Sequence, residues 1–130
     1  AAEGRKAVLL SGGELTVTIR GDGRGGPNQE YALALAIALE GHPAVAALAG
    51  DTDGTDGGSG AADDPAGAVI DPLTLSKAKA FDLDAAAFLS RNDSTAFFGA
   101  IGDLVRPGPT MTNVNDFRVV LIDNSLDRQQ

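Results

Sequence analysis

The sequence contains no cysteine, so disulfides, thiolate nucleophiles and cysteine-based zinc sites are excluded. The single histidine, His42, lies in a Gly-His-Pro turn, where a solvated loop residue is the simplest interpretation. A serine–histidine–aspartate mechanism would have to use this residue. We therefore do not expect nucleophilic catalysis of that kind.

Aromatic residues, long apolar runs and basic runs are scarce. Aromatics make up 5% of the chain, so the core must be built from Ala, Leu, Val and Ile. No stretch approaches the roughly 20 apolar residues of a membrane-spanning helix, and the N-terminal residues lack a signal-peptide pattern. The net charge is −8 and no run of Lys or Arg offers a stripe for a phosphate backbone. We expect no membrane partner, no nucleic-acid partner and a cytoplasmic location.

The remaining composition is that of a globular domain, with 43% hydrophobic and 22% charged residues in a chain of 130. This length supports one domain with its own core. We expect that domain to span residues 1–130, with a core at about 7–123 and a polar tail at 124–130 that frays. The 17 glycines cluster at turns, which favours loops shaped to fit something.

The hydrophobic pattern predicts strands that alternate with helices. Expected strands lie at 7–10, 15–20, 44–49, 66–70 and 117–122, with the first two paired across a tight turn at 12–14. Expected helices lie at 27–40, 72–80, 84–90 and 93–101, with Asp84 as the cap of the third. This alternation predicts an α/β fold in which helices cover both faces of a sheet, as a three-layer sandwich.

The loop at 21–26 reads GDGRGG and lies between a predicted strand and the helix that begins at Pro27. It matches G-x-G-x-x-G, but Asp51 comes later than the roughly 20 residues expected for a ribose contact, which disfavours nicotinamide binding. A phosphate could instead bind the free N–H groups at the helix start beside Arg24. A tight glycine connection without a ligand is the third interpretation.

The loop at 50–58 carries Asp51, Asp53 and Asp56. An EF-hand calcium loop is excluded, because Asp56 stands where glycine is needed and Ala62 where glutamate is needed. Magnesium fits better, since one or two carboxylates suffice, and Asp51 and Asp53 are the candidate ligands. An aspartate here could also accept a proton from a substrate hydroxyl. A solvated acidic loop is the alternative.

The polar loop at 107–116 reads PGPTMTNVND. Asn113 and Asn115 could shape a turn by bonding to the backbone, or they could hold polar groups of a ligand. The sequence leaves both possibilities open.

These motifs occur in one order: SGGE, TV, GDGRGG with NQE, AGDTDGTDG, RNDS with FF, and GPTMTNVND. The set resembles the C-terminal (MOFRL) domain of the class II glycerate kinases, which are often named hydroxypyruvate reductases, over residues 7–123. The resemblance implies a kinase that uses ATP and Mg²⁺ to phosphorylate the 2-hydroxyl of D-glycerate. It also implies a Rossmann-like N-terminal domain, with the active site between the two domains. The chain would then be the C-terminal part of a two-domain enzyme, inactive alone.

The resemblance also implies a set of site residues. The candidate catalytic residues are Glu14, Arg24 and Asp53. The candidate residues for binding substrate or phosphate are Gly12, Gly13, Gly25, Gly26, Asn28, Glu30, Asn113 and Asn115. Under this hypothesis Arg24 and the helix start hold phosphate or the glycerate carboxylate, Asp53 acts as a base or magnesium ligand, and Glu14 is a second polar anchor.

One position departs from the family. The family usually reads GGRNQE, with an arginine where this chain has Pro27. Such an arginine would stabilise the charge of a transferring phosphoryl group, and Arg24 is a candidate substitute. Two alternatives therefore stay open: an NAD(P)H-dependent hydroxypyruvate reductase with nicotinamide at 21–26, and a non-catalytic ligand-binding module.

Overall fold

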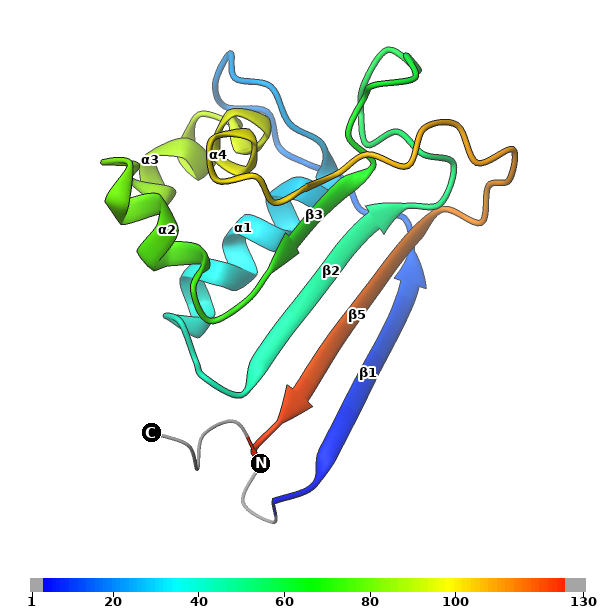
Figure 1. The fold of residues 1–130 in the computed structure, drawn as a ribbon. Helices are drawn as coiled ribbons and strands as arrows, with labels where there is room; N and C mark the ends of the chain where they lie inside the picture. Colours follow the sequence, from blue (N-terminus) through cyan, green and yellow to red (C-terminus); the bar gives the residue numbers. More distant parts are fainter. Residues whose placement is uncertain (1–3, 126–130) are drawn as a thin grey trace.

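A computed structural model describes residues 4–125, and Figure 1 shows their arrangement. The elements follow in the order β1 (Lys6–Gly13), α1 (Pro27–Leu39), β2 (Val45–Asp51), β3 (Gly67–Ile70), α2 (Thr74–Ala80), α3 (Ala85–Ser90), α4 (Ser94–Ile101), β4 (Leu104–Val105) and β5 (Asp116–Asp123). The predicted helices and most predicted strands agree with this order to within a few residues. Most of the tail predicted at 124–130 lies outside the described residues.

The strands form one sheet in the order β1-β5-β2-β3-β4, and each neighbouring pair is antiparallel. The expected sheet flanked by helices is confirmed. Within residues 4–125, however, the helices gather on one face of the sheet (Figure 1), so the second helical layer that we expected is not formed by these residues. Antiparallel neighbours do not require the helical crossovers that place helices on both faces of a parallel sheet.

The strand that we predicted at 15–20 is wrong. This segment forms no strand, and β1 pairs with β5 instead, with Leu9 opposite Val120. A side chain rather than a strand holds the segment: Asn92 Oδ1 accepts hydrogen bonds from the N–H groups of Arg20 (2.6 Å) and Gly21 (2.9 Å). The alternating pattern therefore marks an extended segment, not a member of the sheet.

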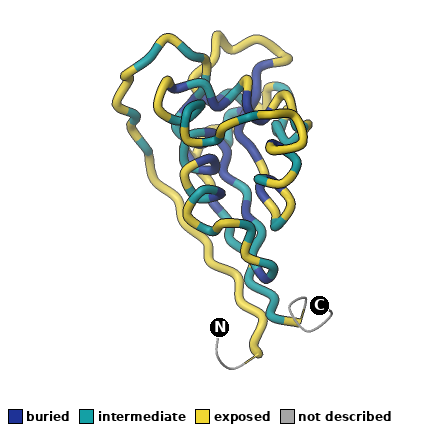
Figure 2. Tube along the Cα trace, turned by 90° about the vertical axis from the view of Figure 1, so that its left-hand side faces the viewer, coloured by how far each residue is buried: buried dark blue, intermediate teal, exposed yellow. Residues whose placement is uncertain are grey.

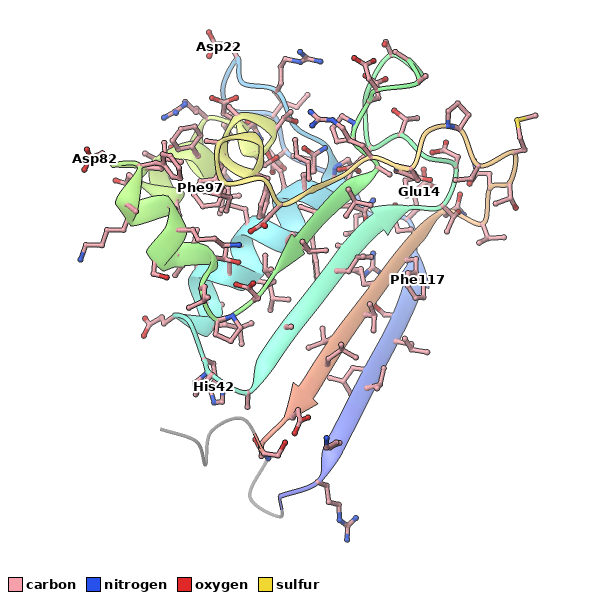
Figure 3. All side chains as sticks on the ribbon, viewed as in Figure 1. Glu14, Asp22, His42, Asp82, Phe97 and Phe117 are labelled. Atoms are coloured by element: carbon pink, nitrogen blue, oxygen red, sulfur yellow. The ribbon has the colours of Figure 1, made fainter. Side chains whose placement is uncertain are left out.

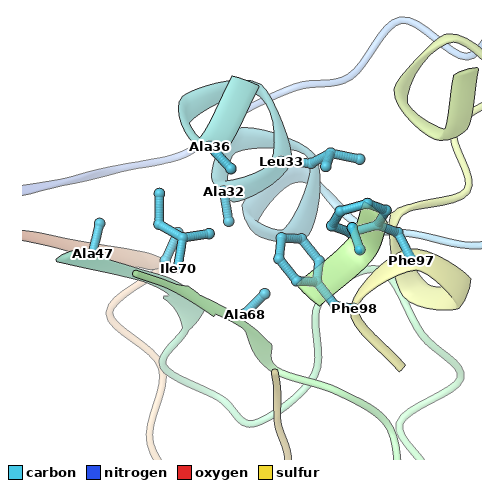
Figure 4. Close-up of a cluster of buried hydrophobic side chains, with 10 residues drawn as sticks. Ala32, Leu33, Ala36, Ala47, Ala68, Ile70, Phe97 and Phe98 are labelled. Atoms are coloured by element: carbon cyan, nitrogen blue, oxygen red, sulfur yellow. The ribbon is translucent and has the colours of Figure 1, made fainter. Parts of the chain in front are cut away.

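The core lies between α1, the sheet and α4 (Figure 4). Small side chains on α1 and on β2 and β3, such as Ala32 and Ala68, let the helix approach the sheet closely. Phe97 and Phe98 of α4 are fully buried, and their rings meet edge to face with centroids 5.2 Å apart. This packing fixes α1 against the sheet and so fixes where its first turn lies.

Candidate functional site

The three candidate loops meet at one end of the sheet, which we call the loop end: the last residues of β1 and β2 and the first residues of β5 and α1 (Figure 1). The register places Asp116 of β5 between Gly13 of β1 and Asp51 of β2. Segments that are far apart in the sequence therefore contribute to one region. Gly12 and Gly13 lie here as the last, exposed residues of β1.

The acidic loop and the late polar loop bind each other through Thr52. Thr52 donates to the Asn115 carbonyl from its N–H (3.0 Å) and its hydroxyl (2.8 Å), and its Oγ1 accepts from the Val114 N–H (2.8 Å). Asn113 Oδ1 accepts from the Asn115 N–H at 2.9 Å, so Asn113 shapes a turn. Both asparagines remain exposed, which leaves the Asn115 side chain accessible to a ligand.

Asp51 and Asp53 lie next to each other in the acidic loop. Asp51 Oδ1 accepts from the Asp53 N–H at 3.1 Å, and Asp53 Oδ1 accepts from the Thr55 N–H at 2.9 Å. Burial raises the pKa of Asp51, and the nearby charges of Asp53 and Asp116 raise it further, against one lowering hydrogen bond from Asp53. This crowding of negative charge would be relieved by a cation.

The donor set at this pair suits magnesium better than calcium. No group of three or more acidic or histidine side chains in residues 4–125 is placed to enclose a metal ion. Mg²⁺ commonly takes one or two carboxylates and completes its shell with water and substrate phosphate. Asp51 and Asp53 are therefore the residues that could supply carboxylates to a magnesium ion.

The start of α1 is already occupied by a carboxylate. Asp56 is 3% exposed, and its Oδ1 accepts from Asn28 N (3.0 Å) and Nδ2 (3.1 Å). Its Oδ2 accepts from Gln29 N (2.9 Å) and Nε2 (3.0 Å). Pro27 has no N–H, so these bonds use the donors that we expected a phosphate to bind. The anion at this helix start is an internal carboxylate, and the expectation of free N–H groups for a phosphate here is wrong.

Asn28 belongs to this buried arrangement. It is fully buried, and its Nδ2 also donates to Asp116 Oδ1 at 2.7 Å. Asp116 Oδ2 accepts from the Leu15 N–H at 2.6 Å, and Arg118 Nη1 lies 3.7 Å from the same oxygen. Asn28 thus joins two buried carboxylates and ties α1 to β5 and to the segment after β1, instead of facing a substrate.

The glycines at 21–26 are explained by close packing. A Cβ on Gly26 would lie 2.0 Å from the Asp56 carbonyl oxygen, and one on Gly25 would lie 2.3 Å from Ser94 Oγ. No strand precedes the loop, so the context of a dinucleotide fingerprint is missing as well. The tight-connection interpretation accounts for this loop.

Arg24 belongs to that loop, and Glu30 lies in the first turn of α1. Arg24 is exposed and borders a cavity of about 210 Å³ that Asp56 and Asp64 also line. Among residues 4–125 its guanidinium forms no ion pair. Glu30 Oε1 instead accepts from Asn92 Nδ2 at 2.7 Å, so Glu30 helps to anchor the segment before α1.

Of the predicted set, the exposed members are Gly12, Gly13, Glu14, Arg24, Asn113 and Asn115, and Asp51 and Asp53 are half-buried. Glu14 is exposed at the loop end, beside the Leu15 N–H that Asp116 holds (Figure 3). Sequence reasoning missed the roles of Asp56, Asp116 and Arg118. One signal for Asp56 was present: the residue before Pro27 is glycine, so a cap for α1 had to come from elsewhere in the chain.

Among residues 4–125, no helix combines the length and hydrophobicity needed to cross a membrane.

Comparisons with known proteins agree on one family. The model of the MOFRL family matches residues 7–116. A protein of Agrobacterium vitis named "Putative hydroxypyruvate reductase" is 51% identical over 89% of this chain and 26% of its own length. The D-glycerate 2-kinase of Thermotoga maritima is 44% identical over 91% of this chain and 27% of its own.

Solved structures give the same result. The crystal structure of the Thermotoga maritima glycerate kinase superposes with a TM-score of 0.83 at 45% identity, covering 89% of this chain and 27% of that one. A Pyrococcus horikoshii protein superposes with a TM-score of 0.80 at 38% identity, covering 89% of this chain and 26% of its own. This chain thus spans about a quarter of the length of these relatives. On the family match, the sequence identities and the shared fold, the chain belongs to the MOFRL family.

Proposed function

We propose that this chain is the C-terminal domain of a glycerate kinase that transfers the γ-phosphoryl group of ATP to the 2-hydroxyl of D-glycerate. The relatives named glycerate kinase or D-glycerate 2-kinase support the reaction class. The observation that carries the proposal is the half-buried Asp51–Asp53 pair at the loop end. The remaining wall of the site comes from a Rossmann-like N-terminal domain.

Positioning and charge neutralisation are most of what phosphoryl transfer requires of a protein. In the reaction the 2-hydroxyl oxygen bonds to the γ-phosphorus, the bond from that phosphorus to the ADP oxygen breaks, and the hydroxyl proton leaves. In this proposal Asp53 accepts this proton or shares a magnesium ion with Asp51. A bound Mg²⁺ would neutralise phosphate charge beside these carboxylates.

Glu14, Asn115 and Arg24 have supporting roles in this proposal. Glu14 and Asn115 are exposed at the loop end and provide polar groups for the hydroxy acid. Arg24 is exposed on the glycine loop and holds a phosphate or carboxylate with its side chain, without help from the helix start. Because Pro27 replaces the family's arginine, the second domain must supply further positive charge.

The test uses a long polypeptide in which this chain replaces the matching segment of the Agrobacterium vitis relative. Two activities are followed: ADP release with D-glycerate and magnesium-ATP, and NADH loss with hydroxypyruvate. Glycerate-dependent ADP release without NADH loss would support the proposal. NADH loss alone would favour the reductase, and silence in both assays would favour a non-catalytic ligand-binding module.

A substitution then tests Asp53 itself. Asp53→Asn should lower the turnover of the chimeric kinase at least about a hundredfold, since general-base catalysis contributes about 10²–10⁴. Asp22→Asn removes the same charge from an exposed residue at the tip of the glycine loop and serves as the matched control (Figure 3). Full turnover in Asp53→Asn would remove Asp53 from the mechanism.

A further inference from the structure

Thr52 lies between the two candidate carboxylates of the acidic loop and holds that loop against another. Its neighbours in the chain are Asp51 and Asp53. Its hydroxyl donates to the Asn115 carbonyl at 2.8 Å and accepts from the Val114 N–H at 2.8 Å, and its own N–H donates to the Asn115 carbonyl at 3.0 Å. One residue of the acidic loop is therefore bonded to two adjacent residues of the late polar loop.

Further bonds run in the opposite direction, from the late polar loop to the acidic loop. The Thr110 hydroxyl donates to the Thr52 carbonyl, and the Thr110 N–H donates to the Asp53 carbonyl at 3.3 Å. The late polar loop is exposed from 109 to 115, like much of the chain at the top of Figure 2. Exposed backbone outside helices and strands is normally mobile, because few buried contacts restrain it. The bonds at Thr52 supply the restraint that burial does not.

The backbone of Asn115 is held in an unusual conformation by the same bonds. Asn115 has a φ of 64°, in the left-handed region, and its carbonyl accepts both the N–H and the hydroxyl of Thr52. Residues in sparsely populated conformations persist when their surroundings hold them, and they cluster at functional sites. Glycine would take this conformation without steric cost, whereas asparagine also places an exposed amide there. Thr52 thus restrains the residue that carries this amide.

Hydrogen bonds within the acidic loop carry the restraint to the carboxylates. Asp51 Oδ1 accepts from the Asp53 N–H, and Asp53 Oδ1 accepts from the Thr55 N–H. Because Thr52 lies between Asp51 and Asp53 in the chain, a shift of its backbone must move one of these carboxylates or break one of these bonds. The position of the Asp51–Asp53 pair therefore depends on the bonds that Thr52 makes.

We propose that Thr52 is a positioning residue whose hydroxyl keeps Asp53 and the Asn115 amide at a fixed separation, an inference that rests on the proposed kinase function. Thr52 acts through these two residues and does not itself touch the substrate. Asp53 serves the reacting hydroxyl or Mg²⁺, and Asn115 serves the hydroxy acid, so both must be in place at the same time. Misplacing a reacting group by about 1 Å can lower a rate about 10²-fold.

The experiment compares Thr52→Val with Thr52→Ser in the Agrobacterium vitis chimera. Valine has the shape of threonine but neither donates nor accepts a hydrogen bond, whereas serine keeps the hydroxyl. Thr74→Val is the matched control. Thr74 is 1% exposed, its Oγ1 accepts from the Asp71 N–H at 2.9 Å, and it follows the end of β3 that lies away from the loop end.

Kinase turnover is measured against the concentration of D-glycerate. Thr52→Val should lower kcat and raise the KM for D-glycerate, each at least about fivefold, and Thr52→Ser should restore both to within about threefold. Partial unfolding alone reduces the number of active molecules and leaves KM unchanged, which is the result expected of Thr74→Val. An unchanged KM in Thr52→Val, or no recovery with serine, would overturn the proposal.

Hydrogen exchange at 53–57, followed by mass spectrometry, gives a readout that needs no turnover. The acceptors of the Asp53 and Thr55 N–H groups are carboxylate oxygens that Thr52→Val leaves in place. Exchange there should nevertheless become at least about tenfold faster in this variant and stay unchanged in Thr74→Val. Equal exchange would overturn the proposal. Faster exchange in a chimera without kinase activity would keep the coupling of the two loops and remove the proposed function.

Discussion

Replacing Asp56 with asparagine should destabilise the domain more than any other single aspartate-to-asparagine exchange at the loop end. The carboxylate oxygens of Asp56 accept four N–H groups from Asn28 and Gln29 at 2.9–3.1 Å, and the residue is 3% exposed. An amide keeps one acceptor oxygen, and its NH₂ group must face the donors on the other side. Two buried N–H groups are then left without an acceptor.

The magnitude follows from these lost bonds. A buried donor left unpaired costs about 1–3 kcal/mol, and the loss of a negative charge at a helix start costs about 0.3–1 kcal/mol. Weaker repulsion with Asp116 and local relaxation offset part of this cost. We therefore expect the free energy of unfolding to fall by about 3–5 kcal/mol. Natural domains have a free energy of unfolding of about 5–15 kcal/mol. The melting temperature should therefore fall by about 11–18 °C in a chain of 130 residues.

The assay is urea unfolding of the isolated chain followed by far-ultraviolet circular dichroism, with hydrogen exchange at the first turn of α1 as a local readout. Asp22→Asn is the control, because Asp22 is exposed and the exchange there should change stability by less than about 0.5 kcal/mol. If Asp56→Asn lowered the free energy of unfolding by less than about 1 kcal/mol, the capping role assigned to Asp56 would be refuted.

Three further outcomes are expected. Gly26→Ala should unfold or strongly destabilise the domain in thermal melts, because the added Cβ would lie 2.0 Å from the Asp56 carbonyl oxygen. Gly99→Ala is the control and should be neutral or slightly stabilising, because its Cβ would lie 3.6 Å from Leu104 Cδ1. Asn92→Ala should lower the free energy of unfolding by about 2–4 kcal/mol, since it removes the acceptor of the Arg20 and Gly21 N–H groups. Hydrogen exchange at 18–23 should become faster. Unchanged exchange there would contradict the role of Asn92 in holding this segment. Hydrogen bonds from Ser125 and the ion pair with Lys6 lower the pKa of Asp123 from 3.8 to about 2. The ionised Asp123 carboxylate therefore stabilises the fold above pH 3.8, and this stabilisation is lost as the pH falls towards 2. Melts at pH 4.5 to 2 should therefore show a smaller acid-dependent decrease for Asp123→Asn than for the unsubstituted chain, and identical slopes would contradict the shift.

The local pattern of the sequence was enough to predict the helices and most of the strands, although β1, which its apolar run predicts as buried, is exposed along its length. Pro27, the run of helix formers after it and the glycine beyond it indicated α1 almost to its last residue. Asp84 was predicted as the cap of α3, and it accepts from the Ala87 N–H at 3.2 Å. These features depend on residues within one or two turns of each other, so a single sequence contains the information.

The segment at 15–20 and the placement of the helices on the sheet show where that information stops. An alternating pattern indicates that a segment is extended, but it does not say whether a strand or the side chain of Asn92, 72 positions after Arg20, will hold it. Alternation of strands and helices likewise does not fix which face of the sheet the helices cover. The strand order and the geometry of the connections decide what holds the segment at 15–20 and which face the helices cover. Strand order and connection geometry are properties of the whole chain.

The sequence by itself determined the class of the fold, the order of its elements, the exclusion of thiol chemistry and the motifs that mark the MOFRL family. Only the tertiary structure decided which polar residues are accessible and which are used internally. Asp56 and Asn28 look like site residues in the sequence, yet Asn28 bridges Asp56, 28 positions away, and Asp116, 88 positions away, in a buried arrangement. The physical reason is that a buried carboxylate needs hydrogen-bond partners, and the fold brings those partners from segments that no local pattern connects.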